Sequence, residues 1–361
     1  MAVVVTTAPP RGIAAPSPRR PPRPRRPIAL KAALSAALAA AILGIGLPKL
    51  AGAPWADVGV AMSRVSPLEL LALGTLWVVG LGVHTISLAA ALPGLSHRRS
   101  LLLNLTGSFV SNLFPLGGAA GTVANYSMAR SWGFGRVEFA RWALVTNLWD
   151  NAIKLALPTV AVGWLARTAV RSNGLEAAAT WSVLGLVVLA VLAAWLFSSD
   201  RLAARVGRIA GWSARRVGRS GEELPARAVA LRRDTAGLVA STWGRLTLGK
   251  LAYAVLQAAL CWSSLRVVGV SVDPAVVFAA FAVERILTLA VLTPGATGFV
   301  EVGMTGTLVA LGVPAGQAAA GVLLYRGYTF LMEIPAGGAG MLWWWVRGRQ
   351  DRGLGSSTTD E

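Results

Sequence analysis

The sequence predicts an all-α polytopic protein that crosses a membrane several times. Of its 361 residues, 55% are hydrophobic and only 14% are charged, whereas a soluble domain carries about 25% charged residues. Several apolar runs approach the roughly 20 residues that a helix needs to span a bilayer. The basic residues cluster in the segments between these runs, which is the distribution of a membrane protein that keeps its basic loops in the cytoplasm.

The net charge of +18 would suggest a nucleic-acid partner in a soluble protein, but none is expected here. Anionic lipids near the basic segments are the expected partners instead. A single cysteine, Cys261, allows no disulfide within the chain. The two histidines, His84 and His97, lie apart in the sequence, and we interpret both as structural. No metal site and no cofactor is expected.

Six full spans and two broken re-entrant hairpins account for the apolar segments. The first span also resembles the core of a signal peptide, but its length favours an uncleaved helix. The full spans are expected at about 28–50, 67–92, 142–165, 177–197, 246–268 and 318–346.

The remaining segments are polar or basic. Residues 1–27 should form a disordered tail, residues 198–235 a basic loop with an amphipathic interfacial helix, and residues 347–361 a short tail. Because strongly basic segments stay inside, both termini are expected in the cytoplasm, at the plasma (inner) membrane.

Residues 104–123 and 284–303 are apolar but interrupted. Proline removes a backbone donor and glycine loosens a helix. Freed backbone groups at membrane depth are tolerated only inside the protein or beside a wet cavity. We therefore predict two re-entrant hairpins, with breaks at Pro115, Gly117, Gly118, Gly121, Pro294, Gly295 and Gly298.

The two broken segments belong to a repeat with an offset of 179 residues. Pro115 precedes Gly133 by 18 residues, and Pro294 precedes Gly312 by the same distance. The predicted topology places the two copies, about 67–165 and 246–346, in opposite orientations within the membrane domain 28–346. Such an inverted repeat, with hairpins meeting near the midplane, is typical of secondary transporters.

Charged residues near a break are costly in lipid and are expected to face a polar groove. Glu301 follows the second break closely and is the leading candidate. Arg285, about two turns before Pro294, is a candidate for binding an anionic head group. Glu284 is its neighbour in sequence, so the two are not expected to share a helical face.

Two further pairs are candidates for the same groove. Arg326 and Glu333 are seven residues apart, which places them on one helical face. Asp150 and Lys154 have the spacing of a structural ion pair. The run Trp343–Trp345 is typical of an interfacial anchor. The sequence contains no HExxH, Walker or GxSxG motif, so no enzymatic activity is expected.

The stretches ERILTLAVLTPGATGFVE and LGVPAGQAAAGVLLYRGYTFLMEIPAG resemble the lysylphosphatidylglycerol synthase transmembrane (flippase-like) family. That family carries a PGG-x-G-x-x-E hairpin, and here Ala296 stands in the place of its second glycine. Tyr325 and Arg326 match a later Leu-Tyr-Arg element. Gly121-Thr122 stands where many relatives have Gly-Glu. The resemblance covers about residues 30–346.

The resemblance implies a membrane domain that moves or handles lipid head groups. About 15 residues follow Val346, so the soluble aminoacyltransferase activity of the bifunctional synthases is not expected in this chain. One hypothesis is a transporter whose groove is lined by Glu301, Arg285 and Arg326, acting on lipids with anionic or modified head groups. Its alternative is a non-transporting partner or scaffold of a lipid- or glycan-modifying enzyme. An intramembrane enzyme is the weakest hypothesis, because no nucleophile constellation is present.

Overall fold

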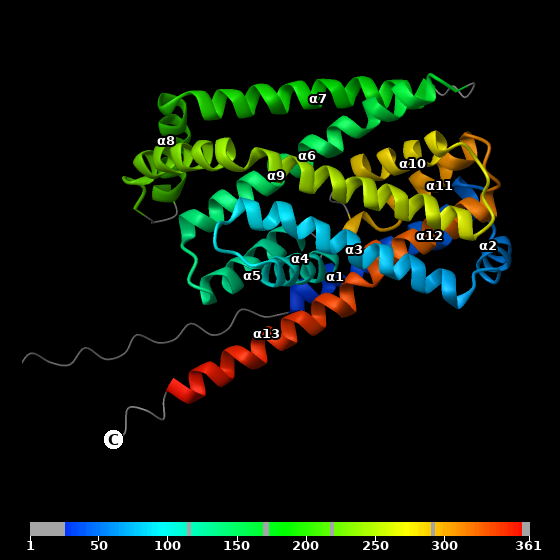
Figure 1. Cartoon of the computed structure of the whole chain (residues 1–361), viewed down its shortest axis with the longest axis horizontal. Helices are drawn as coiled ribbons and strands as arrows, with labels where there is room; N and C mark the ends of the chain where they lie inside the picture. The colour runs from blue at the N-terminus through cyan, green and yellow to red at the C-terminus, as the bar shows by residue number, and fades with distance from the viewer. Residues whose placement is uncertain (1–25, 114–116, 169–172, 217–219, 290–292, 356–361) are drawn as a thin grey trace, which may run out of the picture.

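The computed structural model describes residues 26–113, 117–168, 173–216, 220–289 and 293–355, and within these ranges all regular structure is helical (Figure 1). This confirms the all-α class. In chain order the elements are α1 (Arg26–Leu50), α2 (Trp55–Met62), α3 (Pro67–Ala91), α4 (His97–Leu113), α5 (Gly117–Ser131), α6 (Arg136–Leu165), α7 (Asn173–Ser198), α8 (Asp200–Arg216), α9 (Leu224–Val267), α10 (Pro274–Leu287), η1 (Pro294–Ala296), α11 (Phe299–Ala310), α12 (Ala315–Arg326), η2 (Gly327–Leu331) and α13 (Glu333–Gly355).

Among the described helices, α3 alone is long and apolar enough to cross a membrane by itself. Residues 37–50 of α1 and helix α2 form a second candidate, bent by 96°. Other expected spans coincide with helices that contain charged residues, such as Asp150 and Lys154 in α6. The prediction of six full spans therefore stays a prediction.

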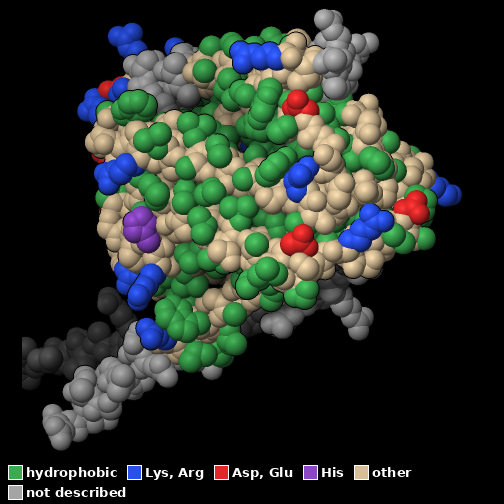
Figure 2. Space-filling view, turned by 45° about the vertical axis from the view of Figure 1, so that its right-hand side comes forward, with side chains coloured by type: hydrophobic (Ala, Val, Ile, Leu, Met, Phe, Trp, Pro, Cys, Tyr) green, Lys and Arg blue, Asp and Glu red, His purple; other side chains and the backbone are tan. Residues whose placement is uncertain are grey.

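The molecular surface is rich in large apolar side chains. Leu68 and Trp181 are each 74% exposed and Leu248 is 69% exposed. Hydrophobic side chains cover much of the face seen in Figure 2, with charged side chains scattered among them. Exposed apolar surface of this extent is unusual for a soluble monomer, and lipid tails would cover it in a membrane.

The first predicted hairpin is the packed pair α4 and α5 (Figure 1). Of the glycines expected at the break, Gly117 is the first residue of α5, whereas Gly118 and Gly121 lie within that helix. Gly121 instead permits close packing, because a Cβ atom there would lie 2.8 Å from the Gly107 carbonyl oxygen. Small residues serve this purpose where membrane helices approach closely. Pro115 lies outside the described residues.

The second predicted break is present. Helix α10 ends at Leu287 and α11 begins at Phe299, with the short helix η1 between them. Gly295 has φ 57° and Gly298 has φ 89°, both in the left-handed region. Ala296, with φ 55°, is also left-handed, a conformation that is costly for a residue with a Cβ atom. The side chains packed around this break must therefore hold it in place.

Helix α9 differs from the prediction of a separate basic loop and span. Its 44 residues run without interruption from Leu224 to Val267, so the helix is about 66 Å long, twice the hydrocarbon thickness. Helix α8 packs along the basic end of α9, where Asp200 of α8 accepts hydrogen bonds from Arg232 and Arg233 of α9. Helix α8 exposes apolar side chains of Val206, Ile209 and Trp212. Its interfacial location stays a prediction.

The last expected span, 318–346, is not one regular helix. The π-helical turn η2 separates α12 from α13. Helix α13 then packs against α4 through Gly337, where a Cβ atom would lie 2.1 Å from the Leu105 carbonyl oxygen. In the middle of α13, Trp343 and Trp345 are about half exposed, and their role as an anchor stays a prediction.

The contact of α13 with α4 predicts a large effect of one methyl group. Gly337→Ala should destabilise the protein by about 1–3 kcal/mol, because the new atom would meet backbone that cannot rotate away. Gly306→Ala in α11 is the matched control, since no atom of a neighbouring segment lies within 4 Å of the place that its Cβ atom would take. The control should leave thermal stability in detergent unchanged or raise it. Equal melting temperatures for the two variants would contradict the close contact.

Candidate functional site

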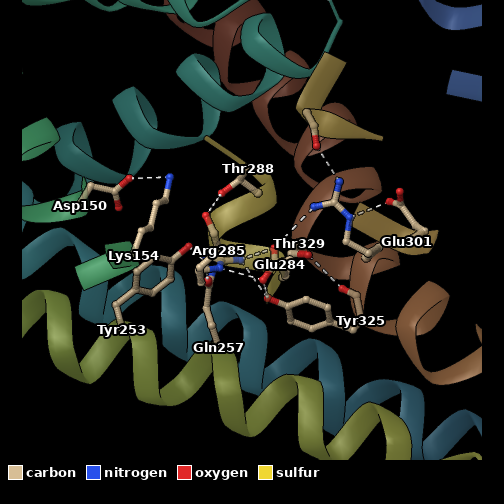
Figure 3. A network of polar contacts seen from close by, with 12 residues as sticks. Asp150, Lys154, Tyr253, Gln257, Glu284, Arg285, Thr288, Glu301, Tyr325 and Thr329 are labelled. Carbon is tan, nitrogen blue, oxygen red and sulfur yellow. Dashed lines mark hydrogen bonds and ion pairs between the residues drawn. The ribbon is translucent and has the colours of Figure 1, made fainter. Parts of the chain in front are cut away.

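The second break is closed by an ion pair between Glu301 of α11 and Arg326 of α12 (Figure 3). The Arg326 Nε atom lies 2.8 Å from Glu301 Oε1, and the side chains of Arg326 and Glu301 are 8% and 3% exposed. The Glu301 Oε2 atom accepts the backbone N–H of Gly298, and the Arg326 guanidinium also donates to the Gly295 carbonyl oxygen at 2.9 Å. Both side chains therefore fasten the backbone of the break.

Glu284 and Arg285 form a second ion pair in the same region. Adjacent residues were not expected to share a helical face, yet the two side chains meet because the long Arg285 side chain turns back onto the adjacent carboxylate. Arg285 also donates to Gln257 Oε1 at 2.7 Å and to the Tyr325 hydroxyl at 3.1 Å. The Tyr325 hydroxyl in turn donates to Glu284 at 3.1 Å.

These two ion pairs join into one unit, which we call the break network: Glu284, Arg285, Glu301, Tyr325 and Arg326. Arg326 connects them, because its guanidinium lies 3.8 Å from Glu284 Oε1 while it holds Glu301. Arg285 and Glu301 are thus linked through Glu284 and Arg326, and no direct bond between them is seen in the described part of the chain.

Arg326 and Glu333 do not share the face that their spacing predicted. The π-helical turn lies between them and changes the register that a regular α-helix would give. Arg326 faces Glu301, whereas Glu333 lies beside Ser108 of α4. Glu333 therefore connects α13 to the first hairpin.

A second group of charges, the α6–α9 cluster, consists of Asp150, Lys154, Lys250 and His84. The expected pair is present, with Lys154 Nζ 2.9 Å from Asp150 Oδ2. Lys250 of α9 lies 3.3 Å from the other carboxylate oxygen and 3.0 Å from His84 Nε2 of α3. The sequence context of His84 suggested an isolated histidine, but in the structure its ring also stacks on Tyr253, with ring centroids 4.1 Å apart.

Two side chains of α9 connect this cluster to the break network (Figure 3). Gln257 donates to the Tyr253 hydroxyl through its amide nitrogen and accepts from Arg285 through its amide oxygen. Sequence reasoning missed Lys250, Tyr253 and Gln257. The available signal was a lysine inside a predicted span, since an intramembrane ionisable residue is by default a functional candidate.

An apolar groove and a polar cavity adjoin at these side chains. The groove, of about 440 Å³, lies between α6, α9 and α10 and includes Trp164, Trp262 and Phe278. A small cavity beside it, with a volume of about 20 Å³, has Lys154, Lys250 and Gln257 in its lining. A volume of this size holds about one water molecule. Ile153 and Ala254 line both, so the polar cavity lies at one end of the apolar groove.

The cations of the two clusters have carboxyl groups of matching number nearby. The cations are Lys154, Lys250, Arg285 and Arg326, and three of the carboxylates are Asp150, Glu284 and Glu301. Glu333, which is 7% exposed, lies within electrostatic reach of Arg285 and Arg326. Lys154, Lys250 and Arg285 line the small cavity together with Asp150, so the cavity is a candidate site for an anion.

Comparison with known families assigns this chain to one of them. Residues 28–337 match the family model described as the lysylphosphatidylglycerol synthase TM region. No curated protein matches the chain.

The ion pair at the break predicts a strong coupling between its partners. Glu301→Ala should cost about 3–5 kcal/mol, because it leaves Arg326 charged and buried without its partner. The double variant with Arg326→Met should cost less than the sum of the single variants, as measured by unfolding in detergent.

Glu138→Ala is the matched control for this cycle. Glu138 occupies the same third position of its helix and accepts the Gly135 N–H at 2.6 Å, but it is exposed and holds no arginine. It should cause a much smaller loss of stability. Additive effects of the Glu301 and Arg326 substitutions would refute the coupling.

Proposed function

The chain belongs to the lysylphosphatidylglycerol synthase transmembrane family, and on that premise we propose that it binds membrane lipids by their head groups and moves them across the bilayer. The family is a membrane domain associated with lipid modification or handling. The further step to translocation is supported by the site itself, which combines an apolar groove, a polar cavity and a broken helix.

The observation that carries the proposal is the junction of groove and cavity. A membrane lipid has an apolar tail and a polar head. The groove offers a surface for the tail, and the small polar cavity at its end would have to widen to admit the head group. The groove volume of about 440 Å³ is within the usual range of ligand sites. Lys154 and Arg285 at its polar end would bind the phosphate of an anionic or modified head group.

The break network would then shape the path of the head group. Glu301 and Arg326 are fully engaged with the backbone of the break, so their role is to hold the two half-helices. Arg285 is the member of the network that also lines the polar cavity. We therefore assign head-group binding to Arg285 and Lys154, and positioning of the break to Glu301 and Arg326.

An inverted repeat is part of this proposal. Adding 179 to the bounds of α5 gives 296–310, and α11 ends at Ala310. Gly133 and Gly312 follow these helices with the same φ of 93°. The same closing hydrogen bond follows in each copy, from Phe134 N to Ala129 O and from Val313 N to Leu308 O.

The orientation of the two copies also supports this interpretation. Helices α3 and α9 begin the copies and pack side by side in opposite directions (Figure 1). Gly80 lies near Leu256, whereas Gly249 lies near Ser87. The hairpins meet where Gly295 approaches Asn112 of α4. With the basic segments inside, the proposed location is the plasma membrane with both termini in the cytoplasm.

The alternative is a non-transporting membrane partner of a lipid- or glycan-modifying enzyme. One observation favours it: the described charges of the break network are paired with one another, as they would be in a purely structural core. In either case we propose that the chain itself is not an enzyme.

A blocking experiment in proteoliposomes tests transport. Ala258→Cys places a thiol in the groove, while the native Cys261 is fully buried. Labelling the folded variant with a bulky maleimide should stop the movement of fluorescent phosphatidylglycerol, because the label fills the groove. Val188→Cys on α7, at an exposed position, is the control whose labelling should leave movement unchanged. Movement that survives the groove label would rule out this path.

Charge removal tests the head-group end of the site. Lys154→Gln should slow the movement of phosphatidylglycerol about tenfold or more, since a hydrogen bond to a charged group contributes about 1.5–3 kcal/mol. Arg266→Gln, on an exposed arginine at the end of α9, is the control for loss of positive charge and should leave the rate unchanged. Equal rates for Lys154→Gln and wild type would remove Lys154 from the site, and absence of movement by the wild type with every lipid would favour the partner function.

A further inference from the structure

The α6–α9 cluster contains a histidine whose environment the lipid path does not explain. His84 is 7% exposed, and its Nε2 atom lies 3.0 Å from Lys250 Nζ. Its other ring nitrogen, Nδ1, is buried and has no hydrogen-bond partner in the described structure. A buried polar atom without a partner is rare and calls for a functional or structural reason.

Only one hydrogen atom can lie between His84 Nε2 and Lys250 Nζ, which are 3.0 Å apart. If Lys250 carries an ammonium group, it donates to a neutral His84 ring, because a protonated Nε2 has no lone pair to accept. A second proton on the pair would place two cations at hydrogen-bonding distance. Histidine is the side chain whose protonation changes most readily near neutral pH.

The surrounding charges determine what a second proton would do. Asp150 on α6 accepts from both Lys250 and Lys154, so one carboxylate already serves two cations. Tyr253 on α9 stacks on the ring at an interplanar angle of 1°. From α4, His97 contacts the neighbouring Thr85 at 2.8 Å.

We propose that His84 and Lys250 form a proton-binding site that couples lipid movement to a pH gradient. This inference rests on the proposed function for its coupling to lipid. One proton from water binds His84 Nε2 and converts the neutral ring to an imidazolium. Lys250 then loses its acceptor on the ring and turns fully to Asp150. The same proton returns to water on the opposite side when the site resets.

A chain of contacts connects this site to the head-group end of the lipid path. The ring of His84 stacks on Tyr253, whose hydroxyl accepts from Gln257, and Gln257 accepts from Arg285. Lys250 and Arg285 also line the same small cavity. A change in the position or charge of Lys250 therefore alters the electrostatic environment of Arg285, which is the proposed phosphate ligand.

The distribution of lipid at steady state tests the coupling. In proteoliposomes with a gradient of one pH unit, wild type should shift the ratio of fluorescent phosphatidylglycerol between leaflets by up to about tenfold, the limit for one proton per lipid. His84→Gln and Gln257→Leu should lose this shift, the first by removing the proton site and the second by removing the link. His97→Gln is the control that should keep it. A His84→Gln protein that still responds to the gradient would overturn the proposal.

A measurement without transport separates the proton site from the proposed function. The chain has two histidines, so His97→Gln leaves one imidazole for ¹⁵N NMR in lipid nanodiscs. The ring of His84 should change from the neutral to the charged form as the pH is lowered, and Lys250→Met should alter that transition. A ring that does not titrate and does not respond to Lys250→Met would overturn the proton site. A responsive ring in a protein that moves no lipid would keep the proton site and refute the proposed function.

Discussion

The architecture depends on the buried ion pair between Glu301 and Arg326. Two charges are expensive to remove from water, and they are tolerated here because each also bonds the backbone of the broken segment. The pair is therefore a backbone clamp as much as an electrostatic contact. Without it, the left-handed residues from Gly295 to Gly298 would lack the interactions that offset their conformational cost.

The charged residues near the break have two different roles, which the sequence does not distinguish: some hold the break, and others line the cavity. Glu301 and Arg326 form hydrogen bonds with each other and with the backbone of the break. Arg285 bonds other side chains of the break network and also lines the small cavity. A site can bind and release a ligand only if some of its groups remain available. Lys154, which is 19% exposed, and Arg285 line the cavity, but each already has a carboxylate partner. A bound head group would therefore compete with Asp150 and Glu284.

Sequence reasoning reached the helical class, the second break and the family, because each leaves a local pattern. Proline and glycine mark the break at Pro294, and alternating apolar runs and basic segments mark a membrane domain. It failed where the answer depends on three-dimensional packing. The pairing of Glu284 with Arg285 depends on side-chain conformation, and the meeting of His84 with Lys250 joins residues 166 positions apart. Gly121 was misassigned because close helix packing and helix breaking both favour glycine.

The uninterrupted length of α9 has a mechanical consequence. Its basic first half packs against α8, and its second half carries Lys250, Tyr253 and Gln257. A helix whose backbone hydrogen bonds continue from end to end transmits a tilt along its whole axis. If the basic end of α9 lies at the lipid surface, as the sequence predicts, a tilt of that end would displace those three side chains together, and the composition of one leaflet would influence the membrane interior.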